Sequence, residues 1–218
     1  AMKLNKLISR IIDFRKLESG KLKLEPQSLN LVTFCKDLTV DYEALCQQKN
    51  IIFHFLPSRT IIRVEFDPEK MEILLSNLIS NAFKYTPEGG KIVLSIDETD
   101  EKVTLVVEDN GIGIQKEFQE VIFDRFFQIE NTEIFSTGDG IGLSFVKHLV
   151  ELHDGTIRVD SELNKGAKFI VELPKKERVD EPVSSEEEII IVPKSVKENM
   201  LVVTESASSP AAPHTLLK

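Results

Sequence analysis

Residues 71–90 read MEILLSNLISNAFKYTPEGG and are the most informative stretch of the chain. Their pattern predicts a helix over about 68–84. On that helix Asn77, Asn81 and Lys84 stand at i, i+4 and i+7, so they share one face. Asparagine is unfavourable inside a helix, and two in register indicate a polar task for this face. A merely solvated face is the alternative, above all for Lys84.

Two glycine-rich segments follow that helix, DNGIGI at 109–114 and GDGIGL at 138–143. The chain contains neither GxxxxGK[ST] nor GxGxxG, the two common nucleotide-binding loops. Alternating glycines bring backbone N–H groups close to a ligand, and the second segment leads into a predicted helix at about 141–153. The N-terminus of a helix favours phosphate. Two ordinary glycine-rich turns are the alternative.

Asp109 ends the predicted strand VTLVVED, directly before the first glycines. A carboxylate only accepts hydrogen bonds, so it suits an exocyclic amine such as that of adenine. A turn-forming Asp-Asn-Gly is the alternative. The amide oxygens of Asn77 and Asn81 suit a Mg²⁺ ion that binds mainly to phosphate oxygens, with Lys84 as a point charge on the same phosphates. Together these residues predict a site for an adenine nucleotide.

From Ser28 to Pro174 the chain alternates strand and helix patterns. A further helix is predicted over 33–49, and polar turns predict two hairpins, at DETDEK (97–102) and SELNKG (161–166). The predicted strands are 51–56, 60–66, 90–97, 102–108, 156–161 and 167–173. This order predicts the α/β class, as a two-layer α/β sandwich with one mixed sheet of about five strands packed on three helices.

Composition limits the possible functions. The 218 residues carry a net charge of −9, which argues against a nucleic-acid binder that relies on bulk positive charge. No apolar stretch approaches the roughly 18 to 20 residues that span a bilayer, and the first residues lack the core of a signal peptide. We therefore expect a cytoplasmic domain that contacts neither nucleic acid nor membrane.

The two ends of the chain differ from its middle. Residues 3–18, KLNKLISRIIDFRKLE, show the apolar seam of a coiled coil or helix bundle, and Gly20 ends the predicted helix. This helix should pack on a partner outside the chain or on a second copy, or else fold back on its own domain. Residues 175–218 contain four of the nine prolines and an acidic run, which predicts a mobile tail or linker. Its apolar runs EIIIVP and MLVV would alternatively add a strand to a partner.

Four segments together resemble a known family. NLISNAFKYTP, VEDNGIGI, FDRFFQ and GDGIGLSFVKHLVELHDGTI, in that order, resemble the asparagine box, first glycine box, phenylalanine box and second glycine box of the sensor histidine kinase catalytic domain. The resemblance implies the Bergerat-type (GHKL) ATP-binding fold, shared with gyrase, the MutL repair proteins and the Hsp-type chaperone, over residues 28–174. It further implies that residues 1–20 end the second dimerisation helix, that 21–27 form a junction, and that 175–218 are the tail.

The resemblance also implies ATP and Mg²⁺ as ligands and assigns roles to individual residues. Asn81 would be the Mg²⁺ ligand, with Asn77 as a second, and Lys84 would contact the phosphates; these three are the candidate catalytic residues. Asp109 would bind the adenine amine. The other residues implied to line the nucleotide site are Tyr85, Gly111, Ile112, Gly113, Ile114, Arg125, Phe126, Gly138, Gly140, Ile141, Gly142 and Leu143.

Residues 114–137 would form a mobile lid over this site, anchored by Phe123, Phe126 and Phe127. A purely structural aromatic cluster is the alternative for these phenylalanines. Asp139 departs from the family pattern, and a carboxylate near a triphosphate should weaken ATP binding, so we expect Asp139→Ser to strengthen it.

The resemblance implies a two-component protein-histidine kinase rather than an ATP hydrolase. Hydrolysing relatives have a glutamate at the position of Asn77, and an amide cannot act as a general base. None of the four histidines lies on the N-terminal helix, so we expect the phosphoacceptor histidine to precede residue 1 in a longer parent chain. That parent would be a homodimeric, membrane-bound sensor that relays phosphate to the receiver domain of a response regulator. A degenerate nucleotide-binding docking module is the alternative; an ATP-driven clamp fails on Asn77.

Overall fold

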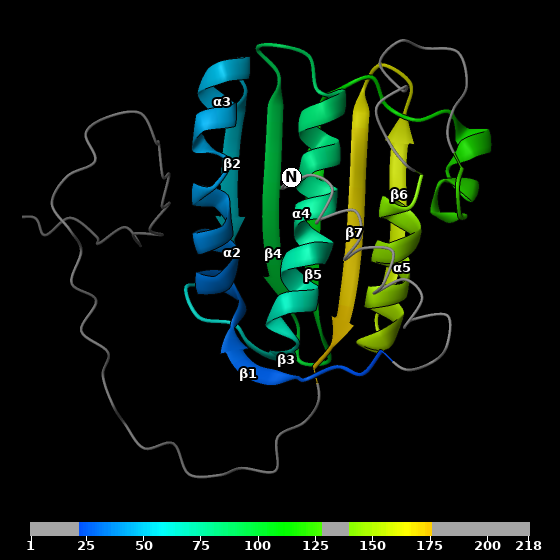
Figure 1. Ribbon diagram of the computed structural model, residues 1–218. Helices are drawn as coiled ribbons and strands as arrows, with labels where there is room; N and C mark the ends of the chain where they lie inside the picture. Colours follow the sequence, from blue (N-terminus) through cyan, green and yellow to red (C-terminus); the bar gives the residue numbers. More distant parts are fainter. Residues whose placement is uncertain (1–21, 128–139, 176–218) are drawn as a thin grey trace, which may run out of the picture. The chain divides into compact units, whose positions relative to one another are not determined.

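The structure, a computed structural model, describes residues 22–127 and 140–175 (Figure 1). Its centre is a five-stranded sheet in the order β2-β4-β5-β7-β6. The strands are β2 (Ile52–Pro57), β4 (Lys91–Glu98), β5 (Lys102–Asp109), β6 (Thr156–Glu162) and β7 (Gly166–Pro174). β2 pairs with β4 in parallel, whereas all other neighbours are antiparallel. The predicted mixed sheet and both predicted hairpins are therefore confirmed.

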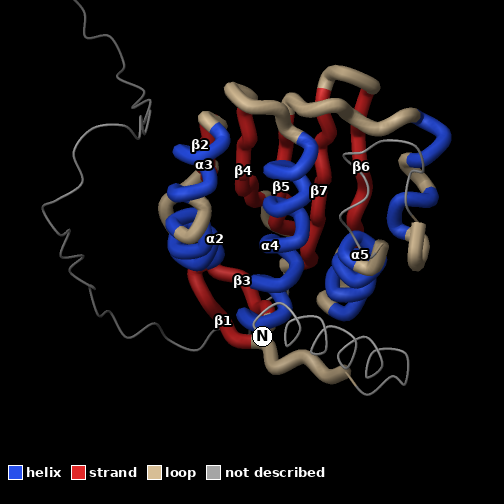
Figure 2. Tube along the Cα trace, turned by 45° about the horizontal axis from the view of Figure 1, so that its top comes forward, coloured by secondary structure: helices blue, strands red, loops and turns tan. Residues whose placement is uncertain are grey.

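Four helices cover one face of this sheet (Figures 1 and 2). They are α2 (Leu31–Val40), α3 (Glu43–Lys49), α4 (Pro68–Tyr85) and α5 (Gly142–Leu152). Every second residue of the central strands points toward them, which is why β4 and β5 alternate between buried and partly exposed positions. The buried layer between helices and sheet includes Leu74, Leu78, Ile92, Leu105, Val146 and Val171. The two-layer α/β sandwich is thus confirmed.

Two local predictions differ from the structure. The single helix expected over 33–49 is broken between α2 and α3, where Tyr42 turns back to donate its N–H to the Thr39 carbonyl at 3.1 Å. That turn lets the Tyr42 ring stack on Phe83, with 5.5 Å between ring centroids. No glycine or proline lies at the break, so the apolar periodicity predicted one continuous helix across it.

The strand expected over 60–66 is also shorter and lies outside the main sheet. It is β3 (Arg63–Phe66), and it pairs antiparallel with β1 (Gln27–Asn30), a strand that the sequence analysis did not predict. Asn30 joins this small ribbon to α2 because its Oδ1 accepts from Ile62 N at 3.1 Å and from Val32 N at 3.2 Å.

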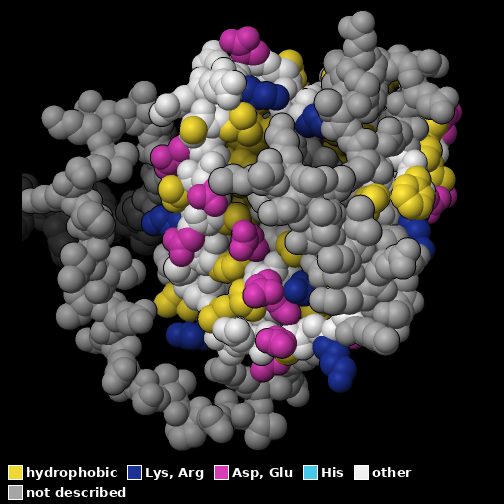
Figure 3. All heavy atoms as spheres, viewed as in Figure 1, with side chains coloured by type: hydrophobic (Ala, Val, Ile, Leu, Met, Phe, Trp, Pro, Cys, Tyr) yellow, Lys and Arg dark blue, Asp and Glu magenta, His cyan; other side chains and the backbone are white. Residues whose placement is uncertain are grey.

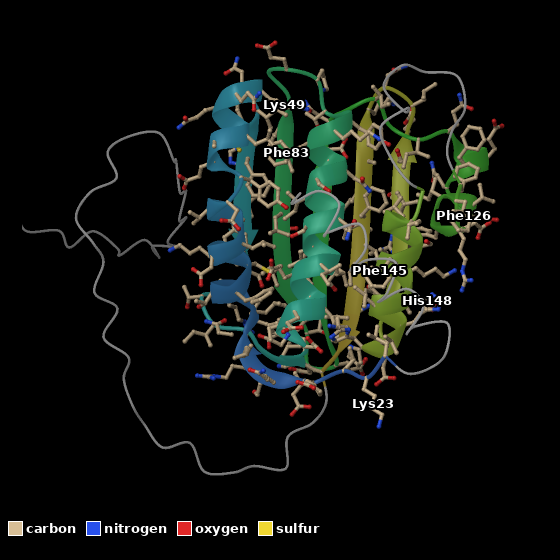
Figure 4. All side chains as sticks on the ribbon, viewed as in Figure 1. Lys23, Lys49, Phe83, Phe126, Phe145 and His148 are labelled. Carbon is tan, nitrogen blue, oxygen red and sulfur yellow. The ribbon has the colours of Figure 1, made fainter. Side chains whose placement is uncertain are left out.

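The elements run between two ends of the domain, which we call upper and lower as they appear in Figure 1. By the upper end we mean the half of the domain from the middle of α4, at Asn77, to the top of the sheet; it holds the segments 109–114 and 140–142. The lower end holds the β1–β3 ribbon and the segment 22–26, whose Lys23 is labelled there in Figure 4. The described chain also leaves β7 at the lower end. There Lys175 donates its backbone N–H to Glu101 O at 2.8 Å, and its Nζ lies 2.6 Å from Glu98 Oε1.

The helix-covered face carries many acidic side chains, in agreement with the net charge (Figure 3). Exposed acidic residues of this helical layer include Asp37, Glu43 and Glu72. Among the described residues, no helix is both long enough and apolar enough to cross a membrane. The predicted N-terminal helix and the tail lie outside the described residues, so the boundaries 1–20, 21–27, 28–174 and 175–218 stay predictions.

Candidate functional site

The meeting point of α4 and α5 holds the first candidate residue, Asn77. Its side chain is 7% exposed, and its Nδ2 donates to the Ile73 carbonyl of the same helix at 2.7 Å. The side-chain oxygen therefore faces away, toward the start of α5, where a Cβ atom on Gly142 would lie 3.1 Å from it. No described residue donates a hydrogen bond to this oxygen, so it remains an available acceptor beside the first turn of α5.

The start of α5 also has N–H groups that meet no acceptor among the described residues. A helix leaves its first N–H groups without partners inside the helix, and a capping side chain commonly accepts from one of them. Here the N-cap residue is Ile141, which has no such side chain, although its carbonyl accepts from Phe145 N at 2.9 Å. Gly142 and Leu143 follow as the first helical residues. Their N–H groups and the helix dipole favour an anion at this position.

The upper end of α4 carries Asn81, Lys84 and Tyr85. Asn81 is half-buried one turn beyond Asn77, and the Lys84 ammonium lies 4.9 Å from the centroid of the Tyr85 ring in a cation–π arrangement. α3 holds this turn in place, because Lys49 Nζ donates to the Phe83 carbonyl at 2.6 Å (Figure 4). The helix thus presents its two amide side chains and its cation on the face that the sequence predicted.

Asp109 lies at the end of β5 and is 7% exposed. Its Oδ1 accepts from Gly111 N at 2.8 Å. Burial raises the pKa of this carboxyl above the usual aspartate value, although hydrogen bonds from the backbone of Gly111 and Ala167 act in the opposite direction. A desolvated carboxylate held in this way is costly unless it serves a purpose, and perturbed carboxyl groups are typical of functional sites.

The first glycine segment is clamped between α4 and the β6–β7 hairpin. Ile112 donates to Tyr85 O at 3.3 Å, its carbonyl accepts from Asn164 N at 2.7 Å, and Ile114 N donates to Ser161 Oγ at 2.8 Å. Gly113 has φ +66°, and a Cβ atom there would overlap the carbonyl oxygen of Glu162. Glycine is therefore required at position 113 because the backbone of Glu162 lies so close. The sequence had instead predicted a close approach to a ligand.

The second glycine segment meets the phenylalanine segment FDRFFQ. Phe126 N donates to Gly140 O at 3.1 Å, and Gly140 has φ +66° with the Phe126 backbone 2.9 Å from where its Cβ would lie. This contact joins the two ends of the stretch 128–139, which is not described. Gly138, Asp139 and most of the later half of the predicted lid fall within that stretch, so the predictions for them lie outside the described residues.

The described part of the predicted lid contains two short 3-10 helices, η1 (Lys116–Phe118) and η2 (Val121–Phe123). Phe123 packs edge-on against Phe169, and the rings of Phe127 and Phe118 lie 5.7 Å apart. Phe126 instead has a 68% exposed side chain and the unusual φ of +61°. Its expected role as an apolar anchor is thus not seen, because it is the backbone of Phe126 that makes the contact. Arg125 is also exposed.

The donor set decides which metal would fit here. Among the described residues there is no group of three or more His, Cys, Asp or Glu side chains that would hold a metal ion. The oxygen donors that α4 does offer are the amides of Asn77 and Asn81. One or two protein oxygens with phosphate and water as the remaining ligands suit Mg²⁺, which keeps much of its hydration. The residues present therefore fit Mg²⁺ bound together with a phosphate ligand.

Two further polar residues were not recognised from the sequence. Ser161 fixes the first glycine segment by accepting from Ile114 N and donating to Gly166 O at 2.7 Å. His153 is 7% exposed and bonded through both ring nitrogens. No local pattern marks either residue, because their partners are distant in the sequence.

Comparison with known proteins agrees with this arrangement. A family model described as histidine kinase-, DNA gyrase B- and HSP90-like ATPase matches residues 66–177. Histidine kinase P4 of Formosa agariphila is 39% identical over 172 residues, covering 77% of this chain and 13% of that protein. Sensor histidine kinase WalK of Bacillus subtilis is 34% identical over 175 residues, covering 79% of this chain and 28% of that protein. The chain thus spans only a minor part of the length of these relatives.

Solved structures show the same fold. The nucleotide-free catalytic domain of histidine kinase ThkA superposes with a TM-score of 0.63 at 32% identity, covering 70% of this chain and 99% of that domain. ThkA solved in complex with the response regulator protein TrrA gives a TM-score of 0.63 at 28% identity, covering 79% of this chain and 49% of that one. The family predicted from the four sequence segments is confirmed. The chain belongs to the histidine kinase-, DNA gyrase B- and HSP90-like ATPases, and within them to the ATP-binding catalytic domains of sensor histidine kinases.

Proposed function

We propose that residues 28–174 bind Mg-ATP at the upper end and form the catalytic half of a protein-histidine kinase that phosphorylates a dimerisation helix. The observation that carries this proposal is the Asn77 side-chain oxygen, which lacks a described donor and faces the uncapped start of α5 at Gly142. A metal–phosphate ligand would satisfy both groups at once, since the metal takes the oxygen and the phosphate takes the N–H groups.

The adenine end of the site rests on Asp109. Its ionised carboxylate accepts a hydrogen bond from the exocyclic amine, while Gly111 and Ala167 hold it from behind. Tyr85 and Ile112 lie beside it, because Ile112 N donates to Tyr85 O. From Tyr85 back to Asn77 is two turns of α4, about 12 Å, which gives the nucleotide an extended path from base to phosphates.

The phosphate end rests on α4 and α5. Asn81 and Asn77 would hold Mg²⁺, and the bound ion would neutralise charge on the phosphate oxygens. The N–H groups at Gly142 and Leu143 bind the phosphates, and Lys84 adds a positive charge when its ammonium leaves the Tyr85 ring. With a net charge of −9, the protein has no bulk positive field, so affinity for phosphate depends on these few groups.

The reaction needs a nucleophile from outside this site. An imidazole nitrogen of the acceptor histidine attacks the γ-phosphorus in line, the bond from that phosphorus to the bridging oxygen breaks, and ADP leaves. The domain orients the triphosphate and stabilises its charge. Asn77 supports transfer over hydrolysis, because its amide cannot remove a proton from water and its Nδ2 is already bonded to Ile73 O.

The family supports a dimerisation helix as the acceptor and a response regulator as the later partner. Residues 1–20 contain no histidine, so the acceptor helix is a segment other than this one, and we expect it within a homodimer. The complex of ThkA with the response regulator TrrA supports a receiver domain as the next phosphate acceptor. We expect the domain to act in the cytoplasm, where ATP is supplied, as part of a membrane-bound sensor.

The test uses γ-labelled ATP and Mg²⁺ with this chain, in the presence and absence of a separately prepared dimerisation hairpin from a histidine kinase parent chain. Label on a histidine of the hairpin is the expected result. Release of free phosphate without the hairpin would identify a hydrolase instead. If no label is transferred and Mg-ATP causes no thermal shift, the chain is a docking module rather than a kinase domain.

A further inference from the structure

Asp67 joins three parts of the lower end. It is 4% exposed, and its Oδ1 accepts from Lys70 N at 3.1 Å, which caps the start of α4. Its second carboxylate oxygen, Oδ2, accepts from Glu25 N at 2.9 Å. Its backbone N–H donates to His153 Nε2 at 3.1 Å. One residue therefore binds α4, the incoming segment 22–26 and the end of α5.

His153 completes this joint from the side of α5, where it is the C-cap residue. Its Nε2 faces the N–H of Asp67, so Nε2 must carry the lone pair and Nδ1 the hydrogen. That hydrogen is donated to the Leu149 carbonyl at 2.7 Å. The two partners thus fix both the orientation of the ring and its neutral tautomer, and the end of α5 is bonded to the start of α4.

The two helices joined in this way carry the candidate nucleotide site away from the joint, on α4 from Asn77 at its middle to Tyr85 and on α5 at its first residues. α4 has 18 residues and α5 has 11, which gives lengths of about 27 and 16 Å. Such helices move as rods, so a shift of one against the other at Asp67 also changes the spacing between Asn77 and Gly142. The segment 22–26 is bonded directly to this joint through Glu25.

We propose that Asp67 and His153 are positioning residues that couple the segment 22–26 to the nucleotide site. The coupling rests on the proposed function, since it requires that ATP binds at the upper end. Coupling between two sites is reciprocal: if the Glu25–Asp67 bond favours nucleotide binding, nucleotide must strengthen that bond by the same factor. This reciprocity separates a coupling role from a merely structural one.

The two oxygens of Asp67 allow the bond to be removed selectively. In Asp67→Asn the amide oxygen keeps the cap on Lys70 N, whereas the NH2 group takes the place of Oδ2 and opposes the Glu25 N–H. Glu25→Pro removes the same bond from the other side, because proline has no N–H. Glu25→Ala keeps the N–H and is the matched control.

The experiment measures amide hydrogen exchange and calorimetric Mg-ATP affinity on the whole 218-residue chain. With the natural sequence, Mg-ATP should slow exchange of the Glu25 amide at least threefold, in addition to protecting residues 140–145. Asp67→Asn and Glu25→Pro should each weaken Mg-ATP binding about three- to tenfold, and the double variant should be no weaker than either single one. Glu25→Ala should bind as the natural sequence does.

Two results would overturn the coupling. In the first, Mg-ATP protects residues 140–145 but leaves Glu25 exchange unchanged. In the second, Asp67→Asn and Glu25→Pro lower the melting temperature yet keep full affinity, so that the bond is only structural. Absence of protection at both places, together with no calorimetric binding, would instead reject the proposed function.

Discussion

The upper and lower ends of the α4–α5 pair differ in how far their polar groups are hydrogen-bonded. At the lower end, both carboxylate oxygens of Asp67 accept hydrogen bonds and both ring nitrogens of His153 are bonded. At the upper end, α5 begins without a capping side chain, and no described residue donates to the Asn77 oxygen. The polar groups that join these helices at the lower end are therefore all hydrogen-bonded, whereas the Asn77 oxygen and the first N–H groups of α5, at the upper end, have no described partner.

The difference shows where a ligand is needed. Buried polar groups in folded proteins nearly always have hydrogen-bond partners. A buried group without a partner in the protein is therefore expected to bind water or a ligand. The lower end is complete without anything further. The upper end has N–H groups at Gly142 that could meet an acceptor and an oxygen at Asn77 that could meet a donor or metal, and on the proposed function a metal-bound phosphate would supply both. Substitutions at the upper end therefore test this difference.

The largest effect is expected at Gly113, where the first glycine segment packs against the β6–β7 hairpin. Gly113→Ala places a Cβ atom against the Glu162 carbonyl at φ +66°, and it should lower the free energy of unfolding by about 2 to 4 kcal/mol. Urea denaturation measures this loss. Gly89→Ala is the control, because Gly89 has φ +77° but nothing within 4 Å of its Cβ position, and about 1 kcal/mol is expected. Equal losses would mean that the upper end is loosely packed.

Asp109→Asn tests the adenine contact. The amide offers an NH2 group or a weaker acceptor to the exocyclic amine, so Mg-ATP affinity should fall roughly 100-fold, about 2.7 kcal/mol. Calorimetry gives the affinity directly. Glu108→Gln is the matched control, since Glu108 neighbours Asp109 but is exposed and paired with Lys168 at 3.6 Å. A similar loss in both variants would indicate a general charge effect rather than a contact with the base.

Gly142→Ala tests the contact between the start of α5 and Asn77. A Cβ atom 3.1 Å from Asn77 Oδ1 pushes that oxygen from its place, so Mg-ATP affinity should fall about tenfold. Glu151→Ala, at the other end of α5, should leave affinity unchanged. If Gly142→Ala binds Mg-ATP with unchanged affinity, Asn77 is not part of the nucleotide site.

The smallest effect is the pH dependence of the ligand-free domain. Burial raises the pKa of Asp109, so the folded state binds its proton more tightly than the unfolded state does. Its stabilising contribution is therefore present at low pH and is lost as pH rises through the folded pKa. Compared with Asp109→Asn, the natural protein should gain stability as pH falls from about 7 to 4. Melting temperatures of both proteins across this range test the sign, and parallel curves would contradict it.

Much of the fold was predictable because its signals are local. Alternation in β4 and β5, the hairpin turns and the face of α4 all depend on near neighbours in the sequence. Asn77 and Asp109 could be identified because an amide inside a helix and a carboxylate at a strand end are unusual residue types for those places. The roles assigned to them remain predictions.

The remainder depends on contacts between distant residues. The β1–β3 ribbon is held by Asn30, and His153 acquires its partner Asp67 only when α4 and α5 pack together. The break at Tyr42 coincides with the stacking of its ring on Phe83, a residue distant in the sequence. Phe126 was expected to anchor the lid because it is aromatic, yet its backbone conformation turns the ring outward.

The ion pairs of Glu98 lie where the described chain leaves the domain. Glu98 is 8% exposed in its side chain and lies between Lys175 and Arg59, with the second contact at 3.4 Å. The segment 22–26 is bonded to Asp67 and Lys175 is paired with Glu98, so the described chain enters and leaves the domain at the same end. β5 has eight residues, about 27 Å, so a rotation of about 10° about this end would move the far end of the strand by about 5 Å. On the proposed function, a rotation of that size would change the distance between a bound γ-phosphate and an acceptor histidine.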